Sequence, residues 1–186
     1  MSENNRFFYN TLKRIALLSD THGFIDQTIV KYLQDADEIW HAGDLGTLAV
    51  SDFLASLKPL KGVYGNVDGQ DVRKVHPAHQ KFQLEGIKVW MTHIGGYPGN
   101  YSPDIKKTIY TEKPMLFICG HSHILKVMPD PKIPGMLHIN PGAAGVHGFH
   151  HIRTMVKFTI DKTKISELDV IELGQRASIE NKNILP

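Results

Sequence analysis

Carboxylate, imidazole and amide side chains follow five short apolar runs in this sequence, each directly after the run ends. The seven residues are Asp20, His22, Asp44, Asn66, His93, His121 and His123. Oxygen and imidazole ligands without a thiolate suit divalent transition ions such as Mn, Fe, Zn, Co or Ni, rather than Ca²⁺ or a structural zinc site. The pattern therefore indicates a metal centre.

Each residue taken alone also has an ordinary structural explanation. Asp20 and Asp44 could cap the helices that follow them, and His22 could be a solvated loop residue. Asn66 could be a turn residue with positive φ. The pair in His121-Ser122-His123 is more specific, because two imidazoles on one face suit a transition metal. The recurrence of such residues at five strand ends favours the metal centre.

The apolar runs predict an α/β fold whose strands deliver these residues. Strands near 13–19, 38–41 and 60–64 alternate with helices near 25–35 and 47–57, which predicts a parallel, right-handed βαβ sheet. Further on we expect a hairpin of 80–84 and 87–91, a helix from Ser102 or Pro103 to Thr111, and strands near 115–119, 124–128, 136–139, 153–160 and 164–172. Ligands gather at the carboxyl ends of strands in such sheets. In an extended backbone, side chains two apart point the same way, so Asp20 and His22 should converge on one ion.

Composition limits the function classes. The 186 residues predict one domain over 13–173, with a flexible lead-in at 1–12 and a polar tail at 174–186. The net charge of +2 comes from scattered basic residues, which gives no strong nucleic-acid signature. There is no N-terminal signal and no long apolar run, so we expect a cytoplasmic protein without a membrane segment. The single Cys119 excludes intrachain disulfides and cysteine-rich zinc sites.

Seven ligands are too many for one ion and suit two ions that share a bridge. Asp44 is the natural bridge, because a carboxylate has two oxygens to divide between metals. Two divalent ions bring +4, and Asp20 and Asp44 bring −2, so the site keeps +2, or +1 with a bound hydroxide. That charge suits an anionic ester such as a phosphate. Two ions roughly 3.5–4 Å apart can generate hydroxide and clamp the attacking and leaving oxygens.

With these residues in place, the sequence resembles the calcineurin-like metallophosphoesterase superfamily. The motifs that carry the resemblance occur in order over most of residues 13–160: Asp20-Thr21-His22, Gly43-Asp44, Gly65-Asn66-Val67-Asp68, Thr92-His93 and Gly120-His121-Ser122-His123. Within the superfamily the chain is most similar to the small phosphodiesterase branch of the YfcE type. Asn140-Pro141-Gly142-Ala143 resembles the Asn-Pro-Gly-Ser of that branch.

The resemblance implies a four-layer α/β/β/α sandwich with two mixed central sheets. It also implies two divalent transition metals, with Mn expected and Fe, Zn, Ni or Co as alternatives, and a small phosphoester substrate. The ligand assignment that it implies is Asp20, His22 and His123 on the first metal, Asn66, His93 and His121 on the second, and Asp44 as the bridge. Among these, we expect Asp44, Asn66 and His121 to carry catalysis.

Val67 is a departure from the family pattern. Many members have a histidine there, which is thought to assist leaving-group departure, and valine cannot transfer a proton. The small phosphodiesterase branch commonly lacks this histidine, so activity is still expected. If the loop of residues 145–151 overhangs the site, a histidine such as His147 could supply the missing acid.

Three further positions are candidates for supporting or substrate-binding roles. Asp68 could orient a ligand or substrate, or it could be a turn carboxylate. Asn140 and Gly142 lie in the motif expected on the phosphate side. Ala143 replaces the Ser of the branch and removes a hydroxyl there, although backbone N–H groups around Gly142 and Ala143 could still face the anion.

The leading hypothesis is a hydrolase, a dinuclear-metal phosphodiesterase that uses a metal-activated hydroxide in an in-line attack without a covalent intermediate. One competitor is a catalytically weak or inactive protein-binding scaffold, because a retromer subunit has this fold with a degraded metal site. Another is a phosphomonoesterase or nucleotidase with the same metals. All seven ligand positions here keep metal-competent side chains, which favours an enzyme. A homo-oligomer is compatible with the sequence.

Overall fold

Two mixed five-stranded sheets form the centre of the computed structural model, which describes residues 12–176 and 183–185. The first sheet contains β1 (Lys13–Leu18), β2 (Glu38–His41), β3 (Leu60–Gly62), β11 (Ile152–Asp161) and β12 (Lys164–Gln175). The second contains β4 (His79–Leu84), β5 (Ile87–Thr92), β8 (Leu116–Ile118), β9 (Leu125–Pro129) and β10 (Leu137–Pro141). Their strand orders are β12-β11-β1-β2-β3 and β4-β5-β8-β10-β9.

Each sheet contains three neighbouring strands that run parallel. In the first sheet, β1, β2 and β3 run parallel, and β11 pairs antiparallel with β1. In the second sheet, β5, β8 and β10 run parallel, with β4 and β9 antiparallel on the two edges. The carboxyl ends of six parallel strands are therefore available to carry loops.

Side chains of β1 alternate between two cores, as expected for a strand that is buried on both faces. Ala16 and Leu18 pack against Ile29 of α1 (Gln27–Leu33) and Leu54 of α2 (Leu48–Leu57). Ile15 and Leu17 share the other core with Met91 of β5, Leu116 of β8 and Ile139 of β10. The first sheet thus lies between a helical layer and the second sheet.

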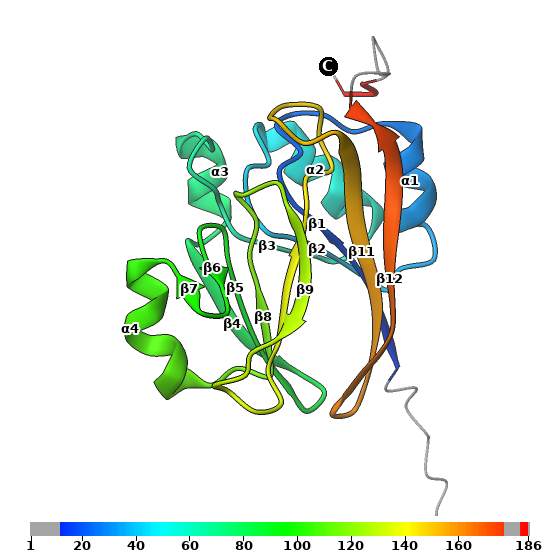
Figure 1. Ribbon diagram of the computed structural model, residues 1–186. Helices are drawn as coiled ribbons and strands as arrows, with labels where there is room; N and C mark the ends of the chain where they lie inside the picture. The colour runs from blue at the N-terminus through cyan, green and yellow to red at the C-terminus, as the bar shows by residue number, and fades with distance from the viewer. Residues whose placement is uncertain (1–11, 177–182, 186) are drawn as a thin grey trace, which may run out of the picture.

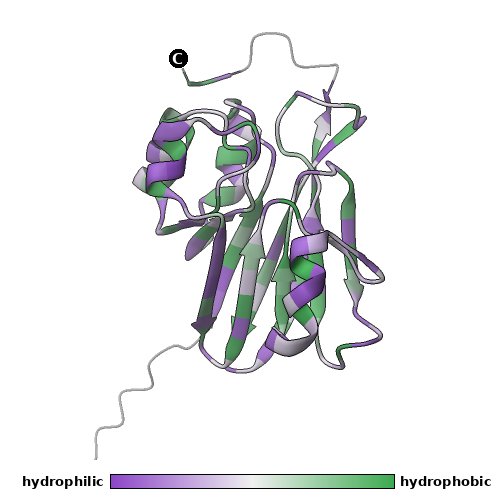
Figure 2. Ribbon diagram, turned by 90° about the vertical axis from the view of Figure 1, so that its left-hand side faces the viewer, coloured by the Kyte–Doolittle hydropathy of each residue, from purple (hydrophilic) through white to green (hydrophobic). Residues whose placement is uncertain are grey.

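The fourth layer is α4 (Pro103–Glu112), on the outer face of the second sheet. Its Ile105 and Ile109 pack against Trp90 and Phe117. Figure 1 shows α1 and α2 on one side of the sheets and α4 on the other, and Figure 2 shows hydrophobic and hydrophilic residues following one another along the strands. The predicted four-layer α/β/β/α sandwich is confirmed.

The predicted strands and helices are present, with small differences in bounds. Two elements were not predicted, the short helix α3 (Gln70–Val75) and the hairpin of β6 (Gly96–Tyr97) and β7 (Asn100–Tyr101), because both are too short to show a period. Strand β12 ends at Gln175, three residues after the predicted strand end at 172. Most of the predicted lead-in and tail lies outside the described residues. Within the described residues no helix has the length and hydrophobicity to span a membrane.

The loops of the two sheets meet where a glycine allows close approach. Gly120, which follows β8, donates its N–H to the carbonyl of His93 after β5. A Cβ atom on Gly120 would lie 1.9 Å from the Ser19 Oγ after β1, so a side chain cannot fit there. Ala144 donates its N–H to the Ser19 carbonyl at 2.9 Å. These contacts bring strand ends from both sheets to one place.

A buried ion pair fixes the loop after β10. Arg153 of β11 is fully buried, and its Nη1 donates to Asp26 Oδ2 at 2.9 Å while its Nε donates to the Ala144 carbonyl at 2.7 Å. The other oxygen of Asp26 accepts from the Ile29 N–H and caps α1. The guanidinium also lies 4.8 Å from the centre of the Phe24 ring.

We expect Arg153→Met to lower the free energy of unfolding by about 3–5 kcal/mol, because Asp26 would be left buried without its partner. The double variant Arg153→Met/Asp26→Asn should recover part of the loss, because it removes that charge. The matched control is Arg14→Met, which breaks an exposed pair with Asp37 and should cost less than about 1 kcal/mol. Chemical denaturation measures all three, and equal losses for Arg14→Met and Arg153→Met would contradict the analysis.

Candidate metal centre

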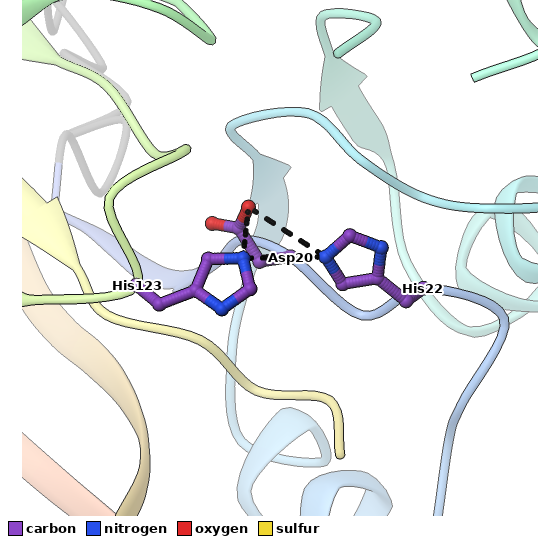
Figure 3. A group of neighbouring side chains, drawn as sticks. All are labelled: Asp20, His22 and His123. Atoms are coloured by element: carbon purple, nitrogen blue, oxygen red, sulfur yellow. Dashed lines mark hydrogen bonds and ion pairs between the residues drawn. The ribbon is translucent and has the colours of Figure 1, made fainter. Parts of the chain in front are cut away.

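Asp20, His22 and His123 direct their ligand atoms toward one point between the two sheets. Asp20 Oδ1 lies 3.2 Å from His123 Nε2 and 4.0 Å from His22 Nε2, and the two imidazole nitrogens are 3.3 Å apart (Figure 3). Asp20 and His22 come from the loop after β1, and His123 comes from the loop after β8. One ion between them could contact all three.

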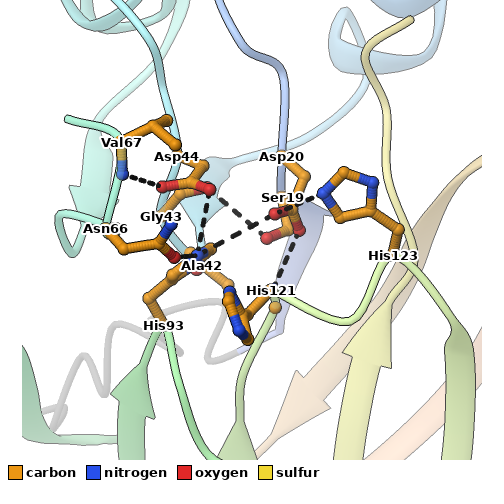
Figure 4. A network of polar contacts seen from close by, with 12 residues as sticks. Ser19, Asp20, Ala42, Gly43, Asp44, Asn66, Val67, His93, His121 and His123 are labelled. Atoms are coloured by element: carbon orange, nitrogen blue, oxygen red, sulfur yellow. Dashed lines mark hydrogen bonds and ion pairs between the residues drawn. The ribbon is translucent and has the colours of Figure 1, made fainter. Parts of the chain in front are cut away.

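A second group shares Asp20 and adds Asp44 and His93. Asp44 Oδ2 lies 3.2 Å from His93 Nε2 and 3.8 Å from His22 Nε2 (Figure 4). Asp20 Oδ1 is 3.9 Å from the same nitrogen of His93. Within each of the two groups, Asp20/His22/His123 and Asp20/Asp44/His93, the ligand atoms all lie within 4.8 Å of one another.

Nε2 is the nitrogen of His93 that faces the centre. The Nδ1–H of this ring donates to the carbonyl of Ala42 at 2.8 Å, because a carbonyl can only accept. That leaves Nε2 toward Asn66 Oδ1 at 3.1 Å and toward Asp44 Oδ2. Burial lowers the pKa of His93, but the Asp44 contact and the charges of Asp20 and Asp44 outweigh burial and raise it above its ordinary value.

Burial and charge also favour the ligand forms of the neighbouring groups. Burial lowers the pKa of His22, which keeps its imidazole neutral and able to bind a metal. Burial raises the pKa of Asp44, but His93, the Val67 N–H and His22 together bring it below its ordinary value. Ionised carboxylates and neutral imidazoles are the forms that bind divalent ions.

An unsatisfied oxygen supports the fit of a cation. The Asp20 side chain is fully buried, and its Oδ1 has no hydrogen-bond partner among the described residues. A buried carboxylate oxygen without a donor is costly unless a cation compensates it. The Nε2 atoms of His22, His93 and His123 lie 4.0, 3.9 and 3.2 Å from Asp20 Oδ1. Asp44 Oδ2 lies 3.8 Å from the same nitrogen of His22. These side chains therefore fit a divalent ion.

The backbone that aims these side chains is left-handed, and the expectation of an extended backbone at Asp20 and His22 was wrong. Five of the predicted ligands have positive φ: Asp20 at 55°, His22 at 49°, Asp44 at 56°, His121 at 67° and His123 at 58°. Non-glycine residues adopt this region at an energetic cost, and such strain gathers at functional sites. Hydrogen bonds hold the conformation, including His22 N–H to the Asp44 carbonyl at 3.0 Å.

Asn66, His121 and His147 lie around these two groups. Asn66 contacts His93 as described, and the His121 ring centre lies 5.3 Å from that of His93. The backbone N–H of His121 donates to Asp20 Oδ2 at 3.2 Å. The exposed ring of His147 lies 5.8 Å from that of His22, so the loop of residues 145–151 does border the site.

Asp68 holds backbone rather than pointing at the metal groups. Its carboxylate accepts from the N–H groups of Gly65 and Gly46 at 2.7 Å each and of Leu45 at 3.3 Å. Leu45 follows Asp44 and Gly65 precedes Asn66. Asp68 therefore joins the loop after β2 to the loop after β3 and positions two predicted ligands.

Asn140 and Gly142 are also engaged within the protein. Asn140 Nδ2 donates to the Gly120 carbonyl at 2.8 Å and to Ser122 Oγ at 3.0 Å. Its Oδ1 accepts from the Gly142 N–H at 3.0 Å. Asn140 thus occupies the Gly142 N–H, so this donor does not face a bound anion. The motif supports the loop that carries His121 and His123.

Two supporting residues depend on tertiary contacts. His41 of β2 is fully buried, its Nδ1 accepts from the Gly43 N–H at 3.2 Å, and its Nε2 lies 3.0 Å from Thr21 Oγ1. Burial lowers the pKa of His41 to about 4. Arg73, on the unpredicted helix α3, donates to the carbonyls of Asp68 and Asn66. The position of His41 at the end of its strand could have indicated this supporting role, whereas no sequence pattern indicated one for Arg73.

The family model for the calcineurin-like phosphoesterase superfamily domain matches residues 14–163. The chain belongs to this superfamily. All of the predicted ligands lie inside the matched range. Membership supports a hydrolase that acts on phosphate esters, and the two groups of side chains provide candidate ligands for its metal.

Relatives agree with this assignment. The chain is 26% identical over 167 residues to a protein of Methanothermobacter thermautotrophicus named "Probable metallophosphoesterase", covering 86% of this chain and 92% of that protein. A Streptococcus pneumoniae protein described as a "predicted phosphoesterase" has a similar structure, with TM-score 0.64, 20% identity, and coverage of 87% and 90%. Wild-type Vps29 of Entamoeba histolytica, in complex with zinc, has TM-score 0.65, 16% identity, and coverage of 87% and 99%. The two structures share the fold.

Asp68→Ala should lower the metal affinity of this superfamily member by about tenfold to a hundredfold, because the loops of Asp44 and Asn66 lose their common support. Competition with a chelator measures the affinity, and a thermal melt of the same sample reports the fold. Asp71→Ala, which removes an exposed carboxylate from α3, is the matched control. Equal affinity in the Asp68 and Asp71 variants would show that Asp68 does not position ligands.

Proposed function

We propose that this protein is a metal-dependent phosphodiesterase whose centre binds two divalent transition ions, with manganese as the expected metal. The observation that carries the proposal is that one oxygen of Asp44 lies near a histidine of each of the two ligand sets that the family resemblance implies. Asp44 Oδ2 lies between His22 of one predicted ligand set and His93 of the other. A shared carboxylate between two sets of imidazoles is the arrangement that a bridged pair of ions requires.

Each side chain has a defined task in this proposal. Asp20, His22 and His123 would hold one ion, Asn66, His93 and His121 the other, and Asp44 would bridge. The Ala42 carbonyl keeps Nε2 of His93 directed at the centre, and the Val67 N–H holds Asp44 Oδ1 at 3.0 Å. When bound, two divalent ions supply Lewis acidity toward a phosphate and lower the pKa of water. Asp44, Asn66 and His121 are the proposed catalytic residues.

Two features support a diester as the substrate. Val67 stands beside Asn66 and cannot protonate a leaving alcohol, so esters with good leaving groups are favoured. Clefts of about 470 Å³ and about 440 Å³ also border the centre, one lined by Asn66 and His93 and the other by His121 and His123. A phosphodiester has two alcohol portions to place, whereas a monoester has one.

A protein-binding scaffold is the second candidate, because the fold is shared with Vps29. The candidate metal ligands of this chain argue against a scaffold. A scaffold has no need to bury two carboxylates beside three imidazoles in strained backbone, and this chain does so. A test of metal content and turnover on one preparation separates the two candidates.

Purified protein supplemented with Mn²⁺ should contain about two ions per chain, and Asp44→Ala should lose most of both, because Asp44 is the proposed bridge. Elemental analysis after gel filtration measures the content. Asp52→Ala, which removes an exposed carboxylate of α2, should keep both ions. A content of one ion per chain, or full retention in Asp44→Ala, would contradict the dinuclear proposal.

With Mn²⁺ or another divalent ion, aryl phosphodiesters should be cleaved in preference to aryl phosphomonoesters. Val67→His should raise rates mainly for esters with poor leaving groups, because an imidazole can donate a proton where valine cannot. Val67→Leu is the matched variant without a titratable group. Monoesters cleaved far better than diesters across several metals would reverse the assignment of the substrate class.

A further inference from the structure

Four large apolar side chains stand exposed around the metal centre. Their exposed fractions are 51% for Val67, 46% for Ile94, 62% for Ile124 and 99% for Phe149. Three of them directly follow a predicted ligand in the sequence, namely Asn66, His93 and His123. We call Val67, Ile94, Ile124 and Phe149 the apolar rim. Single exposed apolar residues are normal, but a group of them around one site marks a binding surface.

Three of the four rim residues, Ile94, Ile124 and Phe149, line the same clefts as the ligands. The cleft of about 440 Å³ is lined by His121 and His123 together with Ile124 and Phe149. A molecule held at the ligands on this side would therefore lie against an aromatic ring and a branched aliphatic side chain.

The cleft of about 470 Å³ has a mixed lining, in which Arg73, His79 and Asp104 stand beside apolar residues. Ile94 lines it beside His93, and Tyr64, Pro103 and Ile105 contribute further apolar surface. The two clefts together place apolar walls on both sides of a centre that carries positive charge when metal is bound.

Hydrogen bonds fix the backbone at three of the four rim residues, Val67, Ile94 and Ile124, so the exposure of these three side chains follows from their loops. The Val67 N–H donates to Asp44 Oδ1, and the Ile124 N–H donates to Ser122 Oγ at 3.3 Å. The Ile94 carbonyl accepts from Ser102 Oγ at 2.9 Å. These loops hold the ligands and the rim residues in one arrangement.

Several polar groups in the two clefts already have partners within the protein. Ser122 Oγ accepts from Asn140 and Ile124, and His150 Nε2 donates to the Gly145 carbonyl at 3.1 Å. In the other cleft, Ser102 is engaged with Ile94, and Arg73 donates to backbone carbonyls. The hydroxyl groups of a sugar would lose their hydrogen bonds to water on binding. The polar groups named above could not replace these bonds, because they are already bonded within the protein, so binding of a polyhydroxylated group is disfavoured.

We propose that the apolar rim binds the alcohol portions of an amphiphilic phosphodiester, in which a long alkyl chain or an aryl group flanks the phosphate. This inference rests on the proposed phosphodiesterase function. The phosphate suits the cationic centre, and the apolar alcohols suit the walls of the two clefts. Alkyl and aryl alcohols share the chemistry that the rim recognises, which is apolar surface to be removed from water.

A series of 4-nitrophenyl phosphodiesters tests the proposal with a constant leaving group. The second alcohol is methyl, butyl, hexyl, octyl or phenyl, and 4-nitrophenolate release gives kcat/KM for each ester. We expect kcat/KM to rise by about twofold to fourfold for each methylene that the rim buries. The phenyl ester separates an aryl preference from an alkyl preference, and thymidine 4-nitrophenyl phosphate serves as the polar comparison.

The matched variants are Ile124→Ser/Phe149→Ser in the rim and Leu57→Ser/Val170→Ser at exposed positions that line neither cleft. The ratio of kcat/KM for octyl to methyl ester should fall about tenfold in the rim variant and stay unchanged in the control. Titration calorimetry of octylphosphonate against methylphosphonate gives a readout without turnover. The heat-capacity change should be more negative for octylphosphonate with wild type, and this difference should shrink in the rim variant.

Three outcomes would overturn the proposal. The first is a kcat/KM that does not change with the length of the alkyl chain, and the second is a thymidine ester cleaved faster than the octyl ester. The third is an equal fall of the octyl-to-methyl ratio in the rim and control variants. The protein could also self-associate, with the association lost only in the rim variant and with kcat/KM the same for all chain lengths. That result would assign the rim to a second copy of the chain and would also overturn the proposal. If no diester is cleaved with any metal, the proposed phosphodiesterase function fails. The calorimetry then decides separately whether the rim binds an amphiphilic phosphonate.

Discussion

The structure depends on two buried carboxylates that need a positive charge beside them. The side chain of Asp20 is fully buried and that of Asp44 is almost so, and one oxygen of Asp20 lacks a hydrogen-bond donor within the described residues. Buried charges are tolerated only when they are paired or bind a metal. The raised pKa of His93 has the same origin, because the two carboxylates attract a proton to its ring when no ion supplies the charge. The requirement for a cation is therefore a property of the folded chain itself.

The two-sheet architecture meets this requirement by bringing loops from both sheets to one edge. Gly120 lets the loop after β8 approach Ser19 after β1, and Asp68 and Asn140 bind the backbone of the ligand loops. Positive φ at five ligand positions turns the side chains toward the centre. Strained loops persist because tertiary hydrogen bonds hold them, so the stability of the sandwich and the geometry of the site are coupled.

The apolar runs predicted the strands, the helices and the residues at the strand ends, whereas the four layers were implied by the resemblance to the superfamily. Apolar runs that end in Asp, Asn or His are local signals, and the order of strands brings their ends together. The direction of each side chain was not predictable, since left-handed φ at Asp20 and His22 depends on hydrogen bonds to a loop more than twenty residues away. The bond from Gly142 to Asn140 and the contacts of Arg73 on α3 are also tertiary, and no periodicity reports them.

The apolar rim bears on the choice between an enzyme and a scaffold, which share this fold. A scaffold surface would gain from apolar residues anywhere on an accessible face. Here Val67, Ile94 and Ile124 directly follow metal-ligand candidates, and Ile94, Ile124 and Phe149 line clefts that those candidates also line. If the centre binds the two proposed ions, a protein partner seated on the rim would also have to cover a cationic site, which demands an anionic group at the middle of an apolar contact. An amphiphilic phosphodiester has that combination in one small molecule. The same charge and the same rim thus favour a substrate over a docked protein.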